Sequence, residues 1–223
     1  MFFYTLIGVL VADEDFTRYI VIGAALATCI AETMLATAST CWDRYQGTIE
    51  TLVSSPIAPG PFFFGRSLQW PLSAMATTSI PLLVVPPFFN VYWSLWQIPV
   101  LIGIVVLTCL STYCMTLLIA SLTLVYDQAR NVTGTMTTLS TTAVCGAMVP
   151  VDFWPEPVQW IAQALPITHG LSAVRALEAD GSSGEILVPL GAMLLAALVW
   201  LTLAFISLRA VFSRSRSGNG LLD

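Results

Sequence analysis

Few residues in this chain are of the types that catalyse reactions or bind metals. It has a single histidine, His169, and one imidazole alone cannot form a metal site. The cysteines include no C-x-x-C pair and mostly lie in apolar runs, which indicates buried small side chains rather than metal ligands or disulfides. We therefore predict no metal site and no catalytic residues. The five cysteines are Cys29, Cys41, Cys109, Cys114 and Cys145.

The basic residues exclude further functions, because all eight are arginine and none is lysine. A phosphate-binding loop of the form GxxxxGK(S/T) places its lysine on the nucleotide phosphates. The chain cannot carry this loop, so any ATP, with its Mg²⁺, has to be bound by another subunit. The net charge of −5 and the pI near 4.7 argue against a nucleic-acid partner, which needs clustered basic residues.

The elements that position the remaining polar residues are expected to be transmembrane helices. The 223 residues are 57% hydrophobic and 9% charged, with a mean hydropathy of +0.82, whereas soluble domains carry roughly 25% charged residues. A helix needs about 20 mostly apolar residues to cross the hydrocarbon of a bilayer. Full spans are predicted over 19–40, 68–88, 98–122, 132–149 and 186–208.

The ends of the chain complete this organisation. Residues 1–12 are apolar but too short to cross, and we interpret them as the outer end of a first helix whose beginning is missing. With that truncated helix the chain would have six spans. We treat residues 1–212 as a single transmembrane domain and residues 213–223 as a basic cytoplasmic tail.

Arginine placement orients the spans. Six arginines fall on one side of the predicted bilayer, whereas only Arg18 and Arg175 fall on the other. Cytoplasmic loops carry the excess of basic residues in membrane proteins. The side with the six arginines is therefore predicted to be cytoplasmic. The six are Arg44, Arg66, Arg130, Arg209, Arg214 and Arg216.

Two features within the bilayer are candidates for a transport path. Glu32 is the only charged residue inside a clear span, and such a carboxylate should face protein or water rather than lipid. It is either a pathway or gating residue, or a carboxylate hydrogen-bonded to hydroxyls near the cytoplasmic end. The span 132–149 is rich in hydroxyls and glycines, which favour tight helix contacts or line a polar cavity. Its candidate pathway residues are Thr137, Thr138 and Thr141.

The cytoplasmic loop 41–56 has the pattern of a short amphipathic helix. Asp43 and Glu50 are seven residues apart and share a face, and 49–53 carries an apolar stripe at helical spacing. Pro56, Pro59 and Pro61 are expected to exclude helix beyond it. This helix either lies on the lipid surface or docks in a groove of a cytoplasmic partner.

The outer segment 149–175 is expected to form two short helices that dip into the outer leaflet, rather than an ordinary loop. Pro155 and Pro157 suit the first turn of a helix, and Pro166 ends it. His169 is assigned a structural hydrogen bond, and Arg175 is expected to pair with Glu178 or Asp180. Trp154 and Trp160 suit the depth of the lipid headgroups.

Both segments resemble permeases of the type-2 ABC transporter family. In the cytoplasmic loop that corresponds to 41–56, the family carries an acidic residue and an arginine, then Gly-Thr-x-Glu-x-Leu, then Ser-Pro, then Gly-Lys at the next span. Arg66 stands for the lysine and Asp43 for a glutamate, and both keep the charge. The matching residues here are Asp43-Arg44, Gly47-Thr48, Glu50, Leu52, Ser55-Pro56 and Gly65-Arg66.

The resemblance implies an all-α integral membrane fold of six spans, with a cytoplasmic coupling helix and outer re-entrant helices. In that family the coupling helix sits on a separate ABC ATPase, so Asp43, Arg44, Thr48 and Glu50 are the implied contacts, and Gly47 would permit close backbone approach. The second and fifth spans of relatives face the dimer axis and the substrate path. The outer helices cap the exit, which implies gate roles for Trp154, Trp160, Pro166, His169 and Arg175.

The expected function is therefore a permease, not an enzyme, in a bacterial cell membrane, paired with a second copy or a paralogue. It would export a hydrophobic or amphipathic drug, antibiotic or lipid-like substrate, with ATP hydrolysed by the partner chain. Export of a lipid-linked glycan or a peptide is the alternative. A secondary transporter would show inverted halves and midplane ionisable residues, and only Glu32 qualifies.

Overall fold

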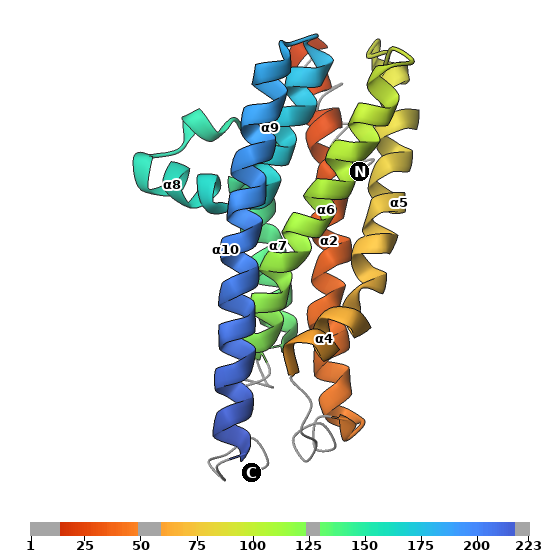
Figure 1. The fold of residues 1–223 in the computed structure, drawn as a ribbon. Helices are drawn as coiled ribbons and strands as arrows, with labels where there is room; N and C mark the ends of the chain where they lie inside the picture. Colours follow the sequence, from red (N-terminus) through yellow and green to blue (C-terminus); the bar gives the residue numbers. More distant parts are fainter. Residues whose placement is uncertain (1–13, 49–58, 124–129, 217–223) are drawn as a thin grey trace.

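A computed structural model describes residues 14–48, 59–123 and 130–216 of the chain. Within these ranges every regular element is a helix, and the long helices run side by side along one axis (Figure 1). In chain order the elements are α2 (Glu14–Tyr45), α4 (Pro59–Ser67), α5 (Gln69–Val84), η1 (Pro86–Phe89), α6 (Gln97–Thr123), α7 (Arg130–Val144), η3 (Val151–Phe153), α8 (Glu156–Ala164), α9 (Pro166–Glu178) and α10 (Ser183–Arg216).

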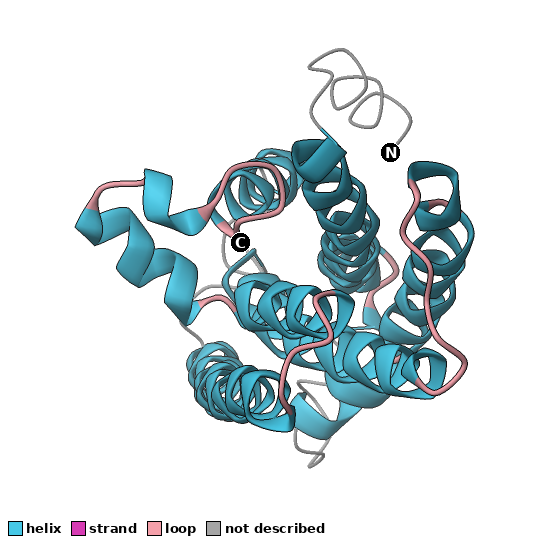
Figure 2. Ribbon diagram, turned by 90° about the horizontal axis from the view of Figure 1, so that it is seen from above, coloured by secondary structure: helices cyan, strands magenta, loops and turns pink. Residues whose placement is uncertain are grey.

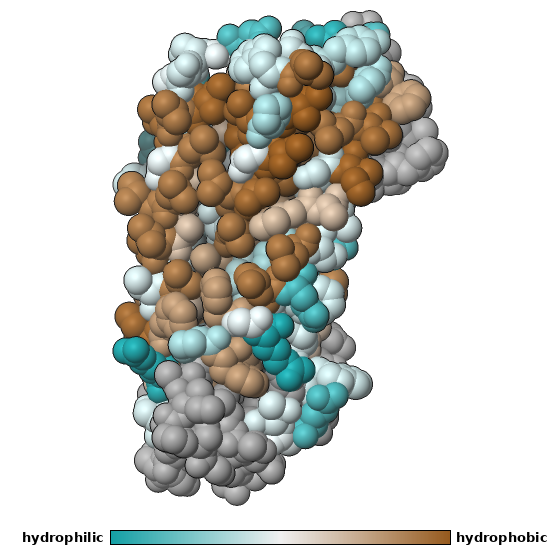
Figure 3. All heavy atoms as spheres, turned by 45° about the vertical axis from the view of Figure 1, so that its right-hand side comes forward, coloured by the Kyte–Doolittle hydropathy of each residue, from teal (hydrophilic) through white to brown (hydrophobic). Residues whose placement is uncertain are grey.

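Four helical segments of the described chain are long and apolar enough to cross a bilayer: Asp15–Thr40, Pro61–Phe89, Gln97–Thr123 and Ser183–Ser213. They confirm four of the five predicted spans. Apolar side chains cover a broad part of the face in Figure 3, and hydrophilic ones gather toward its ends. This surface fits a multi-pass membrane protein.

The remaining predicted span, 132–149, is wrong at its C-terminal boundary. The described part of α7 runs from Arg130 to Val144, so the helix ends five residues before the predicted Val149. Gly146 has a φ of 86°, a left-handed conformation that ends the helix and favours glycine. The chain therefore leaves helical geometry before the predicted end of this span.

The prolines after the predicted coupling helix also behave differently from the expectation. The prediction that Pro59 and Pro61 exclude helix is wrong, because α4 begins at Pro59. Prolines in the first turn of a helix cost no intrahelical hydrogen bond, since the N–H groups there have no partner. α4 is pinned to α6 through Tyr113, whose hydroxyl donates to the Phe64 carbonyl at 2.8 Å and lies 2.5 Å from Ser67 Oγ.

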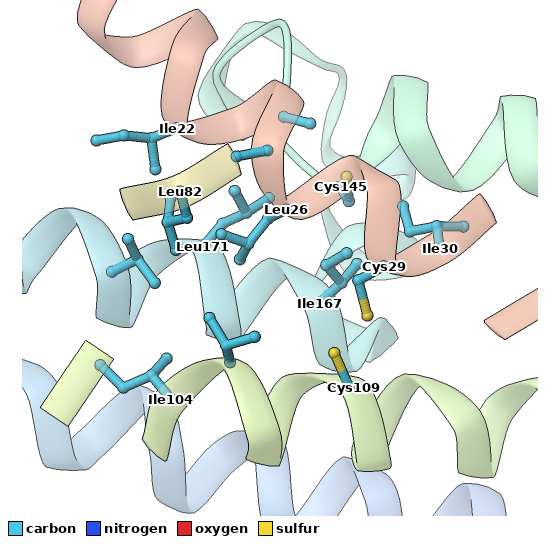
Figure 4. Close-up of a cluster of buried hydrophobic side chains, with 14 of the residues drawn as sticks. Ile22, Leu26, Cys29, Ile30, Leu82, Ile104, Cys109, Cys145, Ile167 and Leu171 are labelled. Carbon is cyan, nitrogen blue, oxygen red and sulfur yellow. The ribbon is translucent and has the colours of Figure 1, made fainter. Parts of the chain in front are cut away.

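The core forms around α2, which packs against α5, α6, α7 and α9. Buried side chains from these helices meet in one cluster, part of which is drawn in Figure 4. Cys29, Cys109 and Cys145 lie in it as free thiols, which confirms their interpretation as buried side chains. Cys29 and Cys109 point toward each other across α2 and α6 (Figure 4). α10 is peripheral, packing on α6 and α9.

Two glycines allow backbones to approach closely, as small residues do in membrane helix packing. A Cβ on Gly23 of α2 would overlap the carbonyl of Ala147, in the turn after α7. A Cβ on Gly170 of α9 would overlap the side chain of Thr108 on α6. These contacts set the spacing of α2 and α9 against their neighbours.

We expect Gly23→Ala to lower the free energy of unfolding by about 1–3 kcal/mol, because the added methyl group must displace backbone in a tightly packed core. Gly103→Ala is the matched control, because nothing lies within 4 Å of a Cβ at Gly103 on α6. It should be neutral or stabilising by up to about 1 kcal/mol. Detergent-solubilised variants can be compared by thermal unfolding, and equal effects at the two positions would contradict the close approach of α2 to Ala147.

Candidate functional site

A polar cavity of about 450 Å³ lies where α2, the turn after α7 and the α8–α9 segment meet. We call this end of the bundle the Tyr19 end, and the opposite end, where α2 finishes, the Tyr45 end. Cys145 and Thr168 are buried at the floor of the cavity, whereas Pro150, Asp152 and Gln163 are exposed. The remaining lining residues are Tyr19, Val151, His169, Ser172 and Arg175.

One carbonyl group joins three elements beside this cavity. The Gly146 carbonyl accepts hydrogen bonds from the Tyr19 hydroxyl and from Arg175 Nη2, both at 2.8 Å. The Arg175 guanidinium carbon also lies 3.5 Å from the centroid of the Tyr19 ring, a cation–π contact. α2, the turn after α7 and α9 are thereby fastened at a single point.

Burial shifts the pKa values of two charged side chains near the Gly146 carbonyl. Desolvation lowers the pKa of Arg175 from its ordinary value, and the neighbouring Tyr19 opposes that shift. An arginine remains protonated at neutral pH despite such a shift. Burial likewise raises the pKa of Glu178 on the next turn of α9, and Arg18 and Arg175 oppose it. The Tyr19 end thus holds a fixed, partly desolvated positive charge.

The expected pair of short helices is present as α8 and α9. Pro155 caps α8 and Pro157 lies in its first turn, as the sequence predicts. α8 ends at Ala164, just before Pro166, and Pro166 begins α9. Figures 1 and 2 show α8 to one side of the long helices. Trp200 of α10 donates to the Ala164 carbonyl at 2.8 Å, which holds the junction of the two helices on the bundle.

The gate residues implied by the resemblance occupy different environments in this segment. Trp160 is 75% exposed on α8, whereas Trp154 is half-buried with its indole nitrogen enclosed and without a hydrogen-bond partner among the described residues. His169 Nε2 lies 2.8 Å from the Gln163 carbonyl, so this histidine does make a structural hydrogen bond. Only His169 and Arg175 of the set line the cavity.

Of the two expected partners of Arg175, Asp180 is hydrogen-bonded to a different residue. Asp180 accepts a 2.7 Å hydrogen bond from the side chain of Gln97, which also donates to the Leu177 carbonyl at 3.1 Å. Gln97 is buried at the start of α6 and fastens it to the end of α9. Sequence reasoning missed this residue, although a glutamine beside a long apolar run is a detectable signal.

Glu32 lies on the face of α2 opposite the one that packs on the turn after α7. Glu32 is half-buried and accepts a 3.3 Å hydrogen bond from Ser73 of α5. Gly23, which faces the turn after α7, is nine residues away and hence about 180° around the helix. Within one subunit, therefore, Glu32 is not brought together with the hydroxyls of α7.

The threonines of α7 are differently placed from one another. Thr141 is buried, Thr137 is half-buried, and Thr138 returns its hydroxyl to the Gly134 carbonyl at 2.9 Å. α7 packs mainly on α2 and α8, and its other side is exposed, including Thr135 and Ser140.

The predicted ATPase-coupling residues fall largely outside the described part of the structure. Asp43 and Arg44 belong to α2, but only their backbone is described. Gly47 has a φ of 71° and nothing within 4 Å of a Cβ, so its backbone conformation explains the glycine within this chain. Thr48 is half-buried. Glu50, Leu52, Ser55 and Pro56 lie outside the described residues.

Comparison with known families decides the class of this protein. A family model for the ABC-2 type transporter matches residues 1–179. The chain belongs to the ABC-2 type transporter family. No curated protein matches the chain. The family match covers α2 to α9 and so includes both the cavity and the predicted coupling loop. ABC-2 proteins are membrane components of ABC transporters, and the resemblance read from the two motifs is confirmed.

Metal chemistry has no support at this site. Within the described ranges, no three His, Cys, Asp or Glu side chains gather closely enough to hold a metal ion. The lining of the cavity includes an arginine, hydroxyls and one carboxylate, which are groups that form hydrogen bonds and ion pairs.

We expect Tyr19→Phe to lower the free energy of unfolding by about 0.5–1.5 kcal/mol, because it removes the hydroxyl bond to Gly146 and keeps the ring under Arg175. Tyr19→Leu should cost roughly 0.5–2 kcal/mol more through loss of the cation–π contact. Tyr92→Phe is the control, because Tyr92 is 72% exposed. Unfolding in detergent with added denaturant measures all three, and a Tyr19→Leu variant as stable as Tyr19→Phe would contradict the stacking.

Proposed function

We propose that this chain is the permease subunit of an ATP-driven exporter in a bacterial cell membrane. The family match over residues 1–179 carries this proposal. The bundle supports it with four apolar spans and with a polar cavity at the end that arginine placement predicts to be outer. A separate ABC ATPase binds ATP and Mg²⁺ and docks at the Tyr45 end, on the loop from Asp43 to Pro56.

The exposed side of α7 supports pairing with a second permease copy or a paralogue. This side carries Thr135 and Ser140 among the exposed apolar residues Val132, Met136 and Leu139. Hydroxyls placed among apolar side chains favour contact with another helix. The path is proposed to run between α2 and α7 of the two subunits, past Thr137, Thr138 and Thr141.

α2 provides the mechanical link between the two ends. It is one helix of 32 residues, about 48 Å long, from Glu14 to Tyr45. Closure of the ATPases would move the loop at the Tyr45 end, and α2 would transmit this motion to the contact of Tyr19 with Arg175. This chain contributes rigid-body coupling, and the bond-breaking chemistry belongs to the ATPase.

The proposed substrate is a hydrophobic or amphipathic drug, antibiotic or lipid-like molecule. A lipid-linked glycan or a peptide moved by the same machinery is the alternative. A secondary transporter is disfavoured, because Glu32 is the only acid in the described spans that lies away from the helix ends.

The coupling assignment is tested by charge reversal. We expect Glu50→Arg to abolish or strongly reduce co-purification with the partner ATPase and the ATP turnover that depends on the permease, because it reverses a charge at the proposed interface. Glu156→Arg, the same reversal on an exposed residue of α8, should leave both unchanged. Normal assembly and turnover in Glu50→Arg would remove this residue from the interface.

A pair of substitutions tests whether Glu32 acts in transport or only in the structure. We expect Glu32→Ala to reduce export of a fluorescent amphipathic dye from loaded cells about tenfold, and Glu32→Gln to reduce it less, because glutamine keeps an acceptor for Ser73. Ser73→Ala controls for loss of this bond alone. If both Glu32 variants export at the wild-type rate, the carboxylate has only the structural role.

A further inference from the structure

The cavity at the Tyr19 end contains hydrogen-bonding groups that the fold does not use. Arg175 donates from Nη2 to Gly146, while its Nε is buried without a hydrogen-bond partner among the described residues. Thr168 Oγ1 at the floor of the cavity is likewise buried and unpartnered within the described part of the chain. Such groups are costly unless a ligand or water satisfies them.

The charges of the cavity are separated by depth. Arg175 is largely enclosed, whereas Asp152 of η3 is exposed at the mouth. His169, another titratable side chain of the lining, already contacts the Gln163 carbonyl. A ligand that carries only negative charge would meet Asp152 on entry. A ligand with an anion at one end and a cation at the other would match both charges.

The mouth of the cavity is bordered by apolar surface. Phe153, next to Asp152, is 76% exposed, and Trp160 and Ile161 on α8 are 75% and 59% exposed. Aromatic side chains of this kind favour the boundary between headgroups and acyl chains. An apolar tail attached to a ligand in the cavity could therefore lie along η3 and α8.

We propose that this cavity binds a phosphate group carrying a primary amine, as in a phosphoethanolamine headgroup, with the phosphate at Arg175 and Thr168 and the ammonium at Asp152. A phosphate accepts several charge-assisted hydrogen bonds from a guanidinium. The cavity volume of about 450 Å³ lies within the range of small-molecule sites. A role for this site in transport rests on the proposed function, whereas binding itself does not.

The test measures binding to the purified full-length chain in detergent by isothermal titration calorimetry, without the ATPase. Dihexanoyl phosphatidylethanolamine should bind at least about tenfold more tightly than the phosphatidylcholine analogue, whose quaternary amine has no N–H, and than the phosphatidylglycerol analogue, which has no cation. Soluble O-phosphoethanolamine distinguishes a soluble ligand from a lipid. If it binds as tightly as dihexanoyl phosphatidylethanolamine, the ligand is a soluble molecule, and if it binds more weakly, the ligand is lipid-like.

Substitutions test the proposed roles of Arg175 and Asp152 in binding the phosphate and the ammonium. Arg175→Gln should weaken binding of the phosphatidylethanolamine analogue about tenfold or more, and Asp152→Asn should abolish its preference over the phosphatidylglycerol analogue. Arg209→Gln, on the exposed surface of α10 near the opposite end, is the control and should bind normally. Because Arg175 also supports the fold, Ser172→Trp provides a second test: its exposed position lines the cavity, and the ring should block binding while Arg175 is retained.

Equal binding of the three lipid analogues by the wild-type chain, or normal binding by folded Arg175→Gln and Ser172→Trp, would overturn the proposal. Neither result bears on the ATPase interface at the Tyr45 end, which the Glu50→Arg experiment tests separately.

Discussion

The need to satisfy backbone polar groups in a bilayer governs the Tyr19 end of this protein. α7 stops at Val144, and the turn that follows exposes carbonyl groups that no further helical turn can reach. Tyr19 and Arg175 supply the donors to one of them, at Gly146. The same two side chains connect α2 with α9, so the interruption of α7 and the joining of these helices have one physical cause.

Hydropathy predicted most of the bundle because each long span is a continuous apolar run. It failed where single residues decide the outcome. Nothing in the composition of 132–149 marks the end of α7, which depends on the left-handed conformation of Gly146. Pro59 and Pro61 do not exclude helix, because they lie in the first turn of α4, where proline costs no intrahelical hydrogen bond. The residue type alone does not distinguish the start of a helix from its end.

The candidate site was predictable only in part. The prolines and tryptophans of 149–166 predicted α8 and α9, because their effects are local. The contact between Tyr19 and Gly146 spans 127 positions, and the two bonds of Gln97 to the end of α9 span 80 and 83. Pairings of this range follow from how the helices pack, which one sequence does not specify. The cavity therefore emerged only from the structure.

The packing around α2 also determines where motion is possible. Gly23 brings α2 against the backbone of Ala147 with no intervening side chain, so α2 and the turn after α7 should move together. Arg175, in contrast, reaches the Gly146 carbonyl from α9 through a long, flexible side chain. This side chain can keep its hydrogen bond when Gly146 shifts, or it can break the bond. A tilt of α2 would therefore first change the contacts of Arg175. Because Arg175 also lines the cavity, the affinity of a ligand bound there would depend on the position of α2. Ligand binding at the Tyr19 end and motion at the Tyr45 end would then be coupled despite the distance between them.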